Sequence, residues 1–149
     1  MKSEETLVII KPDALSKRVA GKVIDAFETA GLRIMGARMV RLSRERAGEF
    51  YAEHRGKGFY EQLVEFMTSN PVIVMVLGGE NAVRRAREVI GKTNPAEAAD
   101  GTIRKEYAES VRYNAVHGSD SESSAQREVG FFFPDRSEIF HWDIREYIT

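Results

Sequence analysis

Short apolar runs divide the chain at intervals and predict its strands. Thr6–Ile10 (TLVII) and Val72–Leu77 (VIVMVL) are continuously apolar, as in buried strands. Leu32–Leu42 alternates imperfectly between apolar and polar residues, and Val129–Phe133 (VGFFF) is a compact, mostly aromatic run. We therefore expect a strand in each of these four segments.

Between these runs, apolar residues recur every three or four positions, which is the spacing of one helix face. A glycine or an Asn-Pro pair follows each stripe and predicts the end of the helix: Gly31, Asn70–Pro71 and Gly91. The stripes consist of Val19, Val23, Ile24 and Phe27, then Phe59, Leu63, Val64, Phe66 and Met67, and finally Ala82, Val83, Ala86, Val89 and Ile90.

The predicted order is strand, helix, strand, helix, strand, helix, long loop, strand. This order fits an α/β (α+β) fold of the ferredoxin-like βαββαβ type, a four-stranded antiparallel sheet with helices packed on one face. The length of 149 residues suggests a single domain over residues 1–149. Between Lys92 and Ser124 small and polar residues prevail, and a loop this long inside a compact domain is more often functional than idle.

Composition and charge exclude several classes of function. The formal net charge is −1, from 22 basic and 23 acidic side chains, so a sequence-independent grip on nucleic acid is not expected. The absence of cysteine excludes disulfides, thiolate metal sites and cysteine nucleophiles. No stretch approaches the roughly 20 apolar residues that span a bilayer, and the apolar run before Lys11 is too short for a signal peptide. We expect a cytoplasmic protein without a membrane partner.

Candidate chemistry begins in the stretch NAVHGSDS, residues 114–121. Of the three histidines in the chain, His54 and His141 have no neighbours that argue for catalysis. His117 is followed by a glycine, which allows close backbone approach, and by serine hydroxyls. A neutral imidazole is a competent nucleophile near pH 7. These neighbours leave two interpretations open: a turn that contains a histidine, or a nucleophile presented to a substrate.

Basic side chains elsewhere suit a polyphosphate. Lys11 follows the first predicted strand, while Arg87 and Arg104 flank a loop that begins at Thr93. Guanidinium groups bind phosphate oxygens bidentately and lysine adds a point charge. Simpler explanations also exist, since Lys11 could be solvated and Arg87 could favour a helix C-terminus.

No phosphate-binding loop of a known kind is present, because the sequence contains neither GxxxxGK[ST] nor GxGxxG. Side chains, together with a metal ion, would have to hold the phosphates. No His/Asp cluster has the spacing of zinc ligands, so we expect no metal ligand from the protein directly. Any metal ion would therefore arrive with the substrate, as Mg²⁺ does with nucleotides.

Four segments of the chain, including the one around His117, together resemble a known family. They are KPDAL, then FYAEHRGKGFYEQLVEFMTSNPVIVMVL, then REVIGKTNPAEAADGTIR, and finally NAVHGSDS with SSAQREVGFFF after it. Together they make the chain resemble the nucleoside diphosphate kinase family over nearly its whole length. The resemblance implies a ferredoxin-like sandwich that transfers the γ-phosphate of a nucleoside triphosphate, mainly ATP, to a nucleoside diphosphate and so maintains the NTP and dNTP pools. It also implies a ping-pong mechanism through a phosphohistidine.

Residue by residue, the resemblance implies that His117 is phosphorylated, on Nδ1 as in the family, and that Glu128 and Ser119 hold and polarise its imidazole. Lys11 and the two arginines would offset the charge of the transferring phosphoryl group. Phe59 would stack on the base, and stacking tolerates every base because it reads only a π-face. The groups implied around the phosphates and the sugar are Lys11, Tyr51, Arg87, Thr93, Arg104 and Asn114.

Some positions also have a purely structural explanation. Tyr51 and Phe59 would suit the edge of a core, and Asp120 and Ser121 are expected to shape the loop, Asp120 through an Asx turn. The C-terminal HWDIREYIT contains the only tryptophan, Trp142, and several large apolar residues. We expect this tail to dock on its own domain or on a neighbouring subunit.

Assembly follows from the resemblance as well. Family members are hexamers or tetramers built from similar dimers, and the loop at Pro95 resembles the family's loop at a trimer contact. A homohexamer is therefore expected, with a homotetramer as the alternative.

The alternative function is a binding module on the same fold, such as an RNA platform. The slightly acidic charge and the VGFFF run, with aromatics on both strand faces, disfavour it. No specific nucleic acid partner is expected, and a moonlighting role is neither supported nor excluded. An inactive homologue would be expected to lack His117, Lys11 or an arginine, and all are present.

Overall fold

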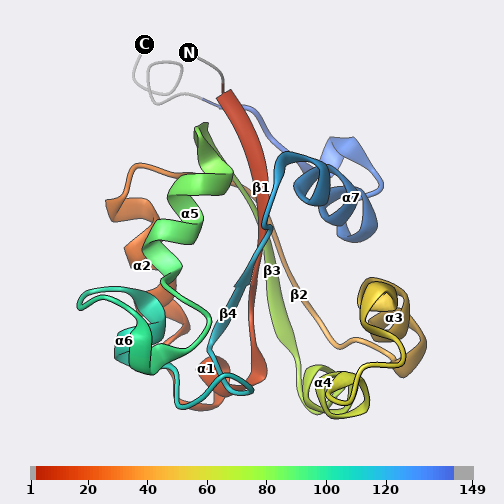
Figure 1. Cartoon of the computed structure of the whole chain (residues 1–149). Helices are drawn as coiled ribbons and strands as arrows, with labels where there is room; N and C mark the ends of the chain where they lie inside the picture. Colours follow the sequence, from red (N-terminus) through yellow and green to blue (C-terminus); the bar gives the residue numbers. More distant parts are fainter. Residues whose placement is uncertain (1–2, 143–149) are drawn as a thin grey trace.

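A four-stranded antiparallel sheet forms the centre of the computed structural model, which describes residues 3–142 (Figure 1). Its order is β2-β3-β1-β4. Because β3 runs antiparallel to both of its neighbours, β1 and β2 are parallel with β3 between them. This is the split βαβ arrangement of the ferredoxin-like fold, as predicted. The strands are β1 (Ser3–Ile10), β2 (Arg33–Val40), β3 (Val72–Glu80) and β4 (Val116–Gly118).

Helices cover both faces of the sheet (Figure 1). The elements on one side are α2 (Ala20–Thr29), α5 (Ala82–Ile90) and α6 (Ile103–Tyr107). Those on the other side are α3 (Arg44–Phe50), α4 (Tyr60–Thr68) and α7 (Glu122–Phe132). The shorter elements are α1 (Pro12–Ser16), η1 (Ala52–His54), η2 (Pro95–Glu97) and η3 (Arg136–Glu138). The prediction of helices on one face is therefore wrong, and the sheet offers no open face of the kind an RNA platform needs.

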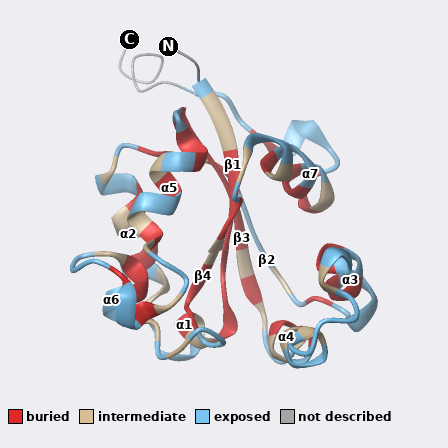
Figure 2. Cartoon of the chain, viewed as in Figure 1, coloured by how far each residue is buried: buried red, intermediate tan, exposed pale blue. Residues whose placement is uncertain are grey.

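Two hydrophobic cores, one on each face, explain this coverage. Along β1, Leu7 and Ile9 point into one core while Val8 and Ile10 point into the other, and all four are fully buried. Successive side chains of a strand alternate between faces, so a continuous apolar run requires a cover on both sides. Full burial of each such side chain is worth about 1.5–3 kcal/mol. The red centre of the sheet in Figure 2 shows this double burial.

The fourth strand lies elsewhere than predicted. Val129–Phe133, expected as a strand, forms the end of α7 and its C-cap residue instead. The buried residues of α7 are Ala125, Glu128, Val129 and Phe132, which follow helical spacing. The true edge strand is Val116–Gly118, which pairs with residues 8–10 of β1. Three residues are too few to show an alternation, so the pattern could not reveal this strand.

The stretch expected as a loop between residues 92 and 124 is interrupted by short helices and a strand. It contains η2, α6, β4 and the start of α7. Polar side chains begin these elements: Asn94 Oδ1 accepts from the Ala96 N–H at 3.0 Å, and Thr102 is the N-cap residue of α6. The small and polar residues that weaken the hydrophobic pattern are thus mainly caps and turns. After these turns, the chain returns to the edge of the sheet at β4, which contains His117.

The described part of the C-terminal tail docks on β2. Trp142 Nε1 donates to the Ile34 carbonyl at 2.9 Å, and the Phe140 N–H donates to the Met35 carbonyl at 2.8 Å. Docking on its own domain is thus confirmed for Trp142, while the rest of the tail lies outside the described residues. Between residues 3 and 142, no helix combines the length and apolar character needed to cross a membrane.

Candidate active site

His117 lies in the middle of the edge strand β4, beside β1. Ile9 is its partner across the ladder, and its ring makes an edge contact with Phe50 at 5.6 Å between centroids. The side chain is 22% exposed. One side of the imidazole is therefore packed against the protein, while part of the ring remains open to a ligand.

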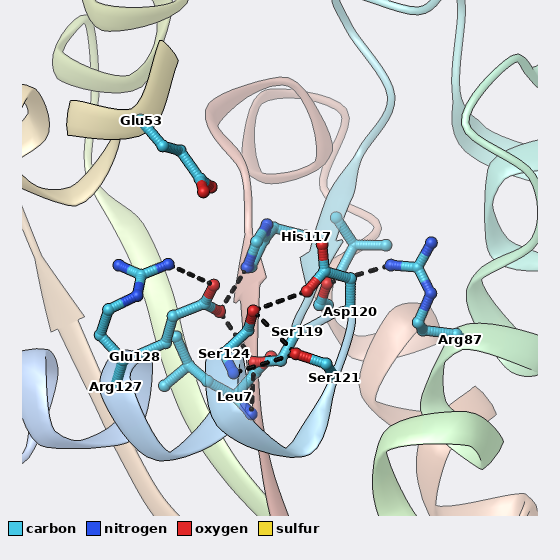
Figure 3. Close-up of polar contacts among 12 residues, drawn as sticks. Leu7, Glu53, Arg87, His117, Ser119, Asp120, Ser121, Ser124, Arg127 and Glu128 are labelled. Atoms are coloured by element: carbon cyan, nitrogen blue, oxygen red, sulfur yellow. Dashed lines mark hydrogen bonds and ion pairs between the residues drawn. The ribbon is translucent and has the colours of Figure 1, made fainter. Parts of the chain in front are cut away.

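Glu128 reaches the imidazole from α7 (Figure 3). Its Oε1 lies 2.7 Å from His117 Nε2 and accepts a second hydrogen bond from Ser119 Oγ, also at 2.7 Å. Arg127 Nη2 is 3.5 Å from the other carboxylate oxygen. Because a carboxylate only accepts, Nε2 carries the ring proton and Nδ1 keeps its lone pair.

The start of α7 orients the residue that holds the histidine. Ser121 is the N-cap, and its Oγ accepts from the Ser124 N–H at 3.1 Å. Asp120 Oδ1 accepts from Ser124 Oγ at 2.6 Å, and this hydrogen bond is the main cause that lowers the pKa of Asp120. Both residues therefore shape the turn after β4, Ser121 as a cap and Asp120 through its bond with Ser124.

Lys11 is buried at the end of β1, next to the same strand edge. Its Nζ donates to Asn114 Oδ1 at 2.8 Å. Burial, followed by the positive charge of Arg104, lowers the pKa of Lys11 to about 8, and the negative charge of Asp13 opposes both effects. An ammonium group that is poorly compensated in this way gains from the arrival of an anion.

Two arginines add positive charge at the same strand edge. Arg104 is buried in α6 and donates to three carbonyls, those of Asn114, Gly91 and Val116. Burial, followed by the nearby charge of Arg87, lowers the pKa of Arg104 to about 10. Arg87 itself is exposed in the last turn of α5, where Nη1 donates to the Gly118 carbonyl at 3.3 Å.

A pocket of about 460 Å³ opens from Lys11 toward the start of α4. Phe59, the N-cap residue of α4, is 48% exposed and supplies an accessible aromatic face. The whole lining consists of Lys11, Phe59, Gln62, Leu63, Thr93, Val111 and Arg112. The pocket thus combines basic and apolar side chains, which suits a ligand with an anionic end and a flat ring.

Tyr51 is buried at the end of α3, with its ring against Phe50 at 4.9 Å between centroids. Burial, with a contribution from the negative charge of Glu128, raises the pKa of Tyr51 well above its ordinary value. Its hydroxyl is buried and has no hydrogen-bond partner among residues 3–142. The phenol is therefore a neutral donor that lacks an acceptor within the described chain.

Comparison with known families decides how this site is classified. The family model described as Nucleoside diphosphate kinase matches residues 4–138. The chain belongs to the nucleoside diphosphate kinase family. The resemblance found in the sequence is thereby confirmed, and the chain is a phosphotransferase of this family.

Individual members of the family are similar over most of the chain. The nucleoside diphosphate kinase of Psychromonas ingrahamii is 56% identical over 135 residues, which cover 91% of this chain and 94% of that protein. The Aquifex aeolicus nucleoside diphosphate kinase superposes with a TM-score of 0.90 at 45% identity, covering 93% and 99% of the two chains. A halophilic nucleoside diphosphate kinase from Halobacterium salinarum, solved in complex with CDP, gives 0.92 at 38% identity, with 99% of each chain covered.

The residues that the sequence nominates for this kinase lie around one strand edge. Glu128 and Ser119 contact His117, and Asn114 joins Lys11 to Arg104 through its side chain and its carbonyl. Phe59 and Thr93 line the pocket at Lys11. Arg87 contacts the Gly118 carbonyl next to His117, and Tyr51 lies near Glu128.

The sequence did not predict two contacts of the site. Phe50 packs against the His117 ring, and Arg127 approaches the second oxygen of Glu128. For Arg127, the sequence indicated only that it is adjacent to Glu128. Charged neighbours are too common in helices for this to predict a contact. Phe50 gave no signal, because a buried aromatic reads as core.

Across the part of the chain that the structure describes, no group of three or more His, Cys, Asp or Glu side chains is arranged to hold a metal ion. The cations near His117 are side chains instead, Lys11, Arg87 and Arg104. A phosphate chain can supply hard oxygen ligands of its own, so a divalent ion fits this site as part of the nucleotide substrate.

Proposed function

We propose that this nucleoside diphosphate kinase transfers the γ-phosphate of a nucleoside triphosphate, mainly ATP, to a nucleoside diphosphate through phosphorylated His117. The observation that carries the proposal is the 2.7 Å contact between His117 Nε2 and Glu128 Oε1, which leaves Nδ1 as the free nucleophile. Glu128 would also stabilise the positive charge that develops on the ring as Nδ1 attacks. Ser119, on the same carboxylate oxygen, would limit the rotation of both groups.

The reaction would proceed in two half-reactions of the same kind. The Nδ1 lone pair attacks the γ-phosphorus, and the bond from that phosphorus to the β–γ bridging oxygen breaks, so that the diphosphate leaves with the electron pair. A terminal β-phosphate oxygen of a second diphosphate then attacks the phosphohistidine. The nitrogen–phosphorus bond breaks and its electron pair returns to Nδ1.

Positive side chains would offset the charge that moves between these oxygens. Lys11 and Arg104 are buried and carry lowered pKa values, so an anion would relieve an existing electrostatic cost. Arg87 is exposed and would approach from the solvent. Removal of one such donor typically lowers the rate by about 10²–10³-fold.

The pocket beyond Lys11 would hold the nucleoside. Phe59 would stack on the base, while Asn114 and Thr93 would contact the sugar and the phosphates. Tyr51, whose hydroxyl lacks a partner within the described residues, would donate to the phosphoryl group on His117. Stacking reads no base edge, so nucleotides of every base would be accepted. The relative from Halobacterium salinarum was solved with CDP, a pyrimidine nucleotide.

Mg²⁺ would enter as part of the nucleotide, bound by its phosphate oxygens. The ion would neutralise part of the charge on those oxygens and keep the phosphate chain in a compact geometry. Lys11 and the arginines would then contact the phosphate oxygens that remain free.

The same proposal includes one kinase domain over residues 1–149, a cytoplasmic location and a homohexamer, with a homotetramer as the alternative. The outer edge of β2, with Met39 62% exposed on it, is a surface on which such a subunit contact could form. Light scattering of the purified chain distinguishes the assemblies, because a hexamer has six times the chain mass of 16.8 kDa and a tetramer four times.

Labelling with γ-³²P-ATP and Mg²⁺ tests the proposed function. The protein is expected to acquire a phosphate that is labile in acid, stable in alkali, and transferred to added GDP as labelled GTP. A His117→Ala variant with wild-type circular dichroism is expected to acquire none. Label that survives acid, or that persists in the variant, would contradict the phosphohistidine.

A further inference from the structure

A strained turn connects Asn114, which contacts Lys11, to the strand that contains His117. Ala115 has φ of 73°, a conformation that residues other than glycine rarely adopt. The Val116 N–H donates to the Asn114 carbonyl at 2.8 Å, so residues 114–116 form a γ-turn of the rarer kind, with positive φ at its centre. The turn lies between Asn114, which binds Lys11, and His117.

Both backbone groups of Ala115 are held by the KPD segment at the end of β1. Its N–H donates to Asp13 Oδ2 at 3.0 Å, and its carbonyl accepts from the Lys11 N–H at 2.9 Å. A backbone conformation of this kind persists only where surrounding contacts impose it. These two hydrogen bonds are such contacts, and they cross 102 and 104 residues of sequence respectively.

Asp13 is well placed to impose the turn. It follows Pro12 in the first turn of α1, and the Lys11 carbonyl accepts from the Ala14 N–H at 3.1 Å, so the backbone around it is fixed. Its second oxygen, Oδ1, is buried and has no hydrogen-bond partner within residues 3–142. Asp13 is partly buried overall, but an acceptor oxygen buried without a partner is costly for the fold, which suggests that the residue is retained for a task.

We propose that Asp13 is a positioning residue, which holds Ala115 in the γ-turn and thereby sets both the Lys11–Asn114 contact and the place of His117. The inference rests on the proposed function, because it assigns a task within that site. Asp13 touches neither the nucleotide nor His117 in this scheme. It acts through the backbone of Ala115 and through its negative charge near Lys11.

A double-mutant cycle on Asp13 and Ala115 tests the positioning role. Asp13→Ala removes the acceptor, and kcat is expected to fall by about tenfold because the strained turn is then sparsely populated. Glycine adopts positive φ without strain, so Asp13→Ala in an Ala115→Gly background is expected to lose less than about threefold relative to Ala115→Gly alone. Asp25→Ala, an exposed helical aspartate in α2, serves as the matched control.

The pH dependence of kcat/KM provides a second test, because a residue that only stabilises the fold would not change it. The charged groups facing Lys11 are Arg104 from α6 and Asp13 from α1, and Asp13 raises the pKa of the ammonium. Asp13→Asn keeps an oxygen that can accept from Ala115, so kcat at pH 7 is expected to stay within about threefold of wild type. Its charge is gone, so the alkaline limb of kcat/KM is expected to move to lower pH.

Two results would overturn the inference. One is an equal loss from Asp13→Ala in the wild-type and the Ala115→Gly backgrounds, which would place its effect outside the turn. The other is an alkaline limb that does not move in Asp13→Asn. Failure of the proposed function is distinguishable, because it would appear in the wild type, as absent nucleotide-dependent labelling of His117.

Discussion

His117 and Glu128 are joined by a contact of 2.7 Å between Nε2 and Oε1. The contact fixes which nitrogen of the ring is available, because the nitrogen that donates to the carboxylate has no free lone pair. It also joins β4 to α7, the two elements that a short run of small and polar residues separates in sequence. The reactivity of His117 therefore depends on a side chain from another element.

Glu128→Gln is expected to lower the rate of phosphoenzyme formation by about 10–100-fold, because a neutral amide stabilises the developing imidazolium less than a carboxylate does. KM for the nucleotide should change little, since Glu128 lies behind the ring rather than in the pocket. Rapid-quench measurement of phosphohistidine over a range of ATP concentrations separates the two quantities. Arg127→Gln, which alters only an exposed neighbour of the carboxylate, is the control, and an equal loss in both variants would contradict this role.

The pH dependence of kcat/KM is expected to report Lys11. Burial and Arg104 lower the pKa of Lys11 to about 8, so the ammonium that binds phosphate is lost as pH rises through that value. Activity should therefore fall on the alkaline side of pH 8 in wild type. In Lys11→Arg the charge persists, so the lower overall activity should show no such limb. An unchanged limb in that variant would assign the titration to another group.

Phe59→Ala is expected to weaken binding of ADP, GDP and CDP alike, by about 5–150-fold, because stacking on a base is worth about 1–3 kcal/mol. Isothermal titration calorimetry with the three diphosphates measures the loss. Phe140→Ala removes another exposed aromatic that lies beside β2, away from the pocket, and should leave the affinities unchanged. A loss confined to one base would indicate recognition of a base edge instead.

Tyr51→Phe should separate stability from activity. The Tyr51 hydroxyl is buried without a partner in the described chain, so its removal is expected to raise the free energy of unfolding by up to about 1 kcal/mol. The rate of phosphoryl transfer should fall by about three- to tenfold, because the donor proposed for the phosphoryl group is lost. Urea unfolding and rapid-quench kinetics measure the two effects, with Tyr107→Phe as the control. A variant that is less stable and fully active would contradict both expectations.

The central strands could be predicted from the sequence because burial on both faces leaves a continuous apolar run. TLVII and VIVMVL are such runs, and both are strands in the structure. VGFFF looks similar over five residues, yet the preceding Ala125 and Glu128 continue the same face at helical spacing. Because one residue of that buried face is a glutamate, the pattern of apolar residues alone does not show the helical spacing.

The site could be predicted only in part. The resemblance named residues that lie beside His117 or line the pocket at Lys11, but the contacts that orient them join distant positions. Asp13 reaches Ala115 across 102 residues, and Ser119 and Glu128 share one oxygen only because β4 turns into α7. The tautomer of His117 likewise depends on a hydrogen bond, which a single sequence does not contain.

The position of the phosphate on the His117 ring tests the proposed reaction most directly. Protein labelled with ¹⁵N-histidine is phosphorylated with ATP and Mg²⁺ and examined in alkali-stable form by ¹H–¹⁵N–³¹P NMR. The expected result is phosphorus coupled to Nδ1, with the proton retained on Nε2 beside Glu128. Phosphorus on Nε2, or on a serine oxygen of the same loop, would contradict it.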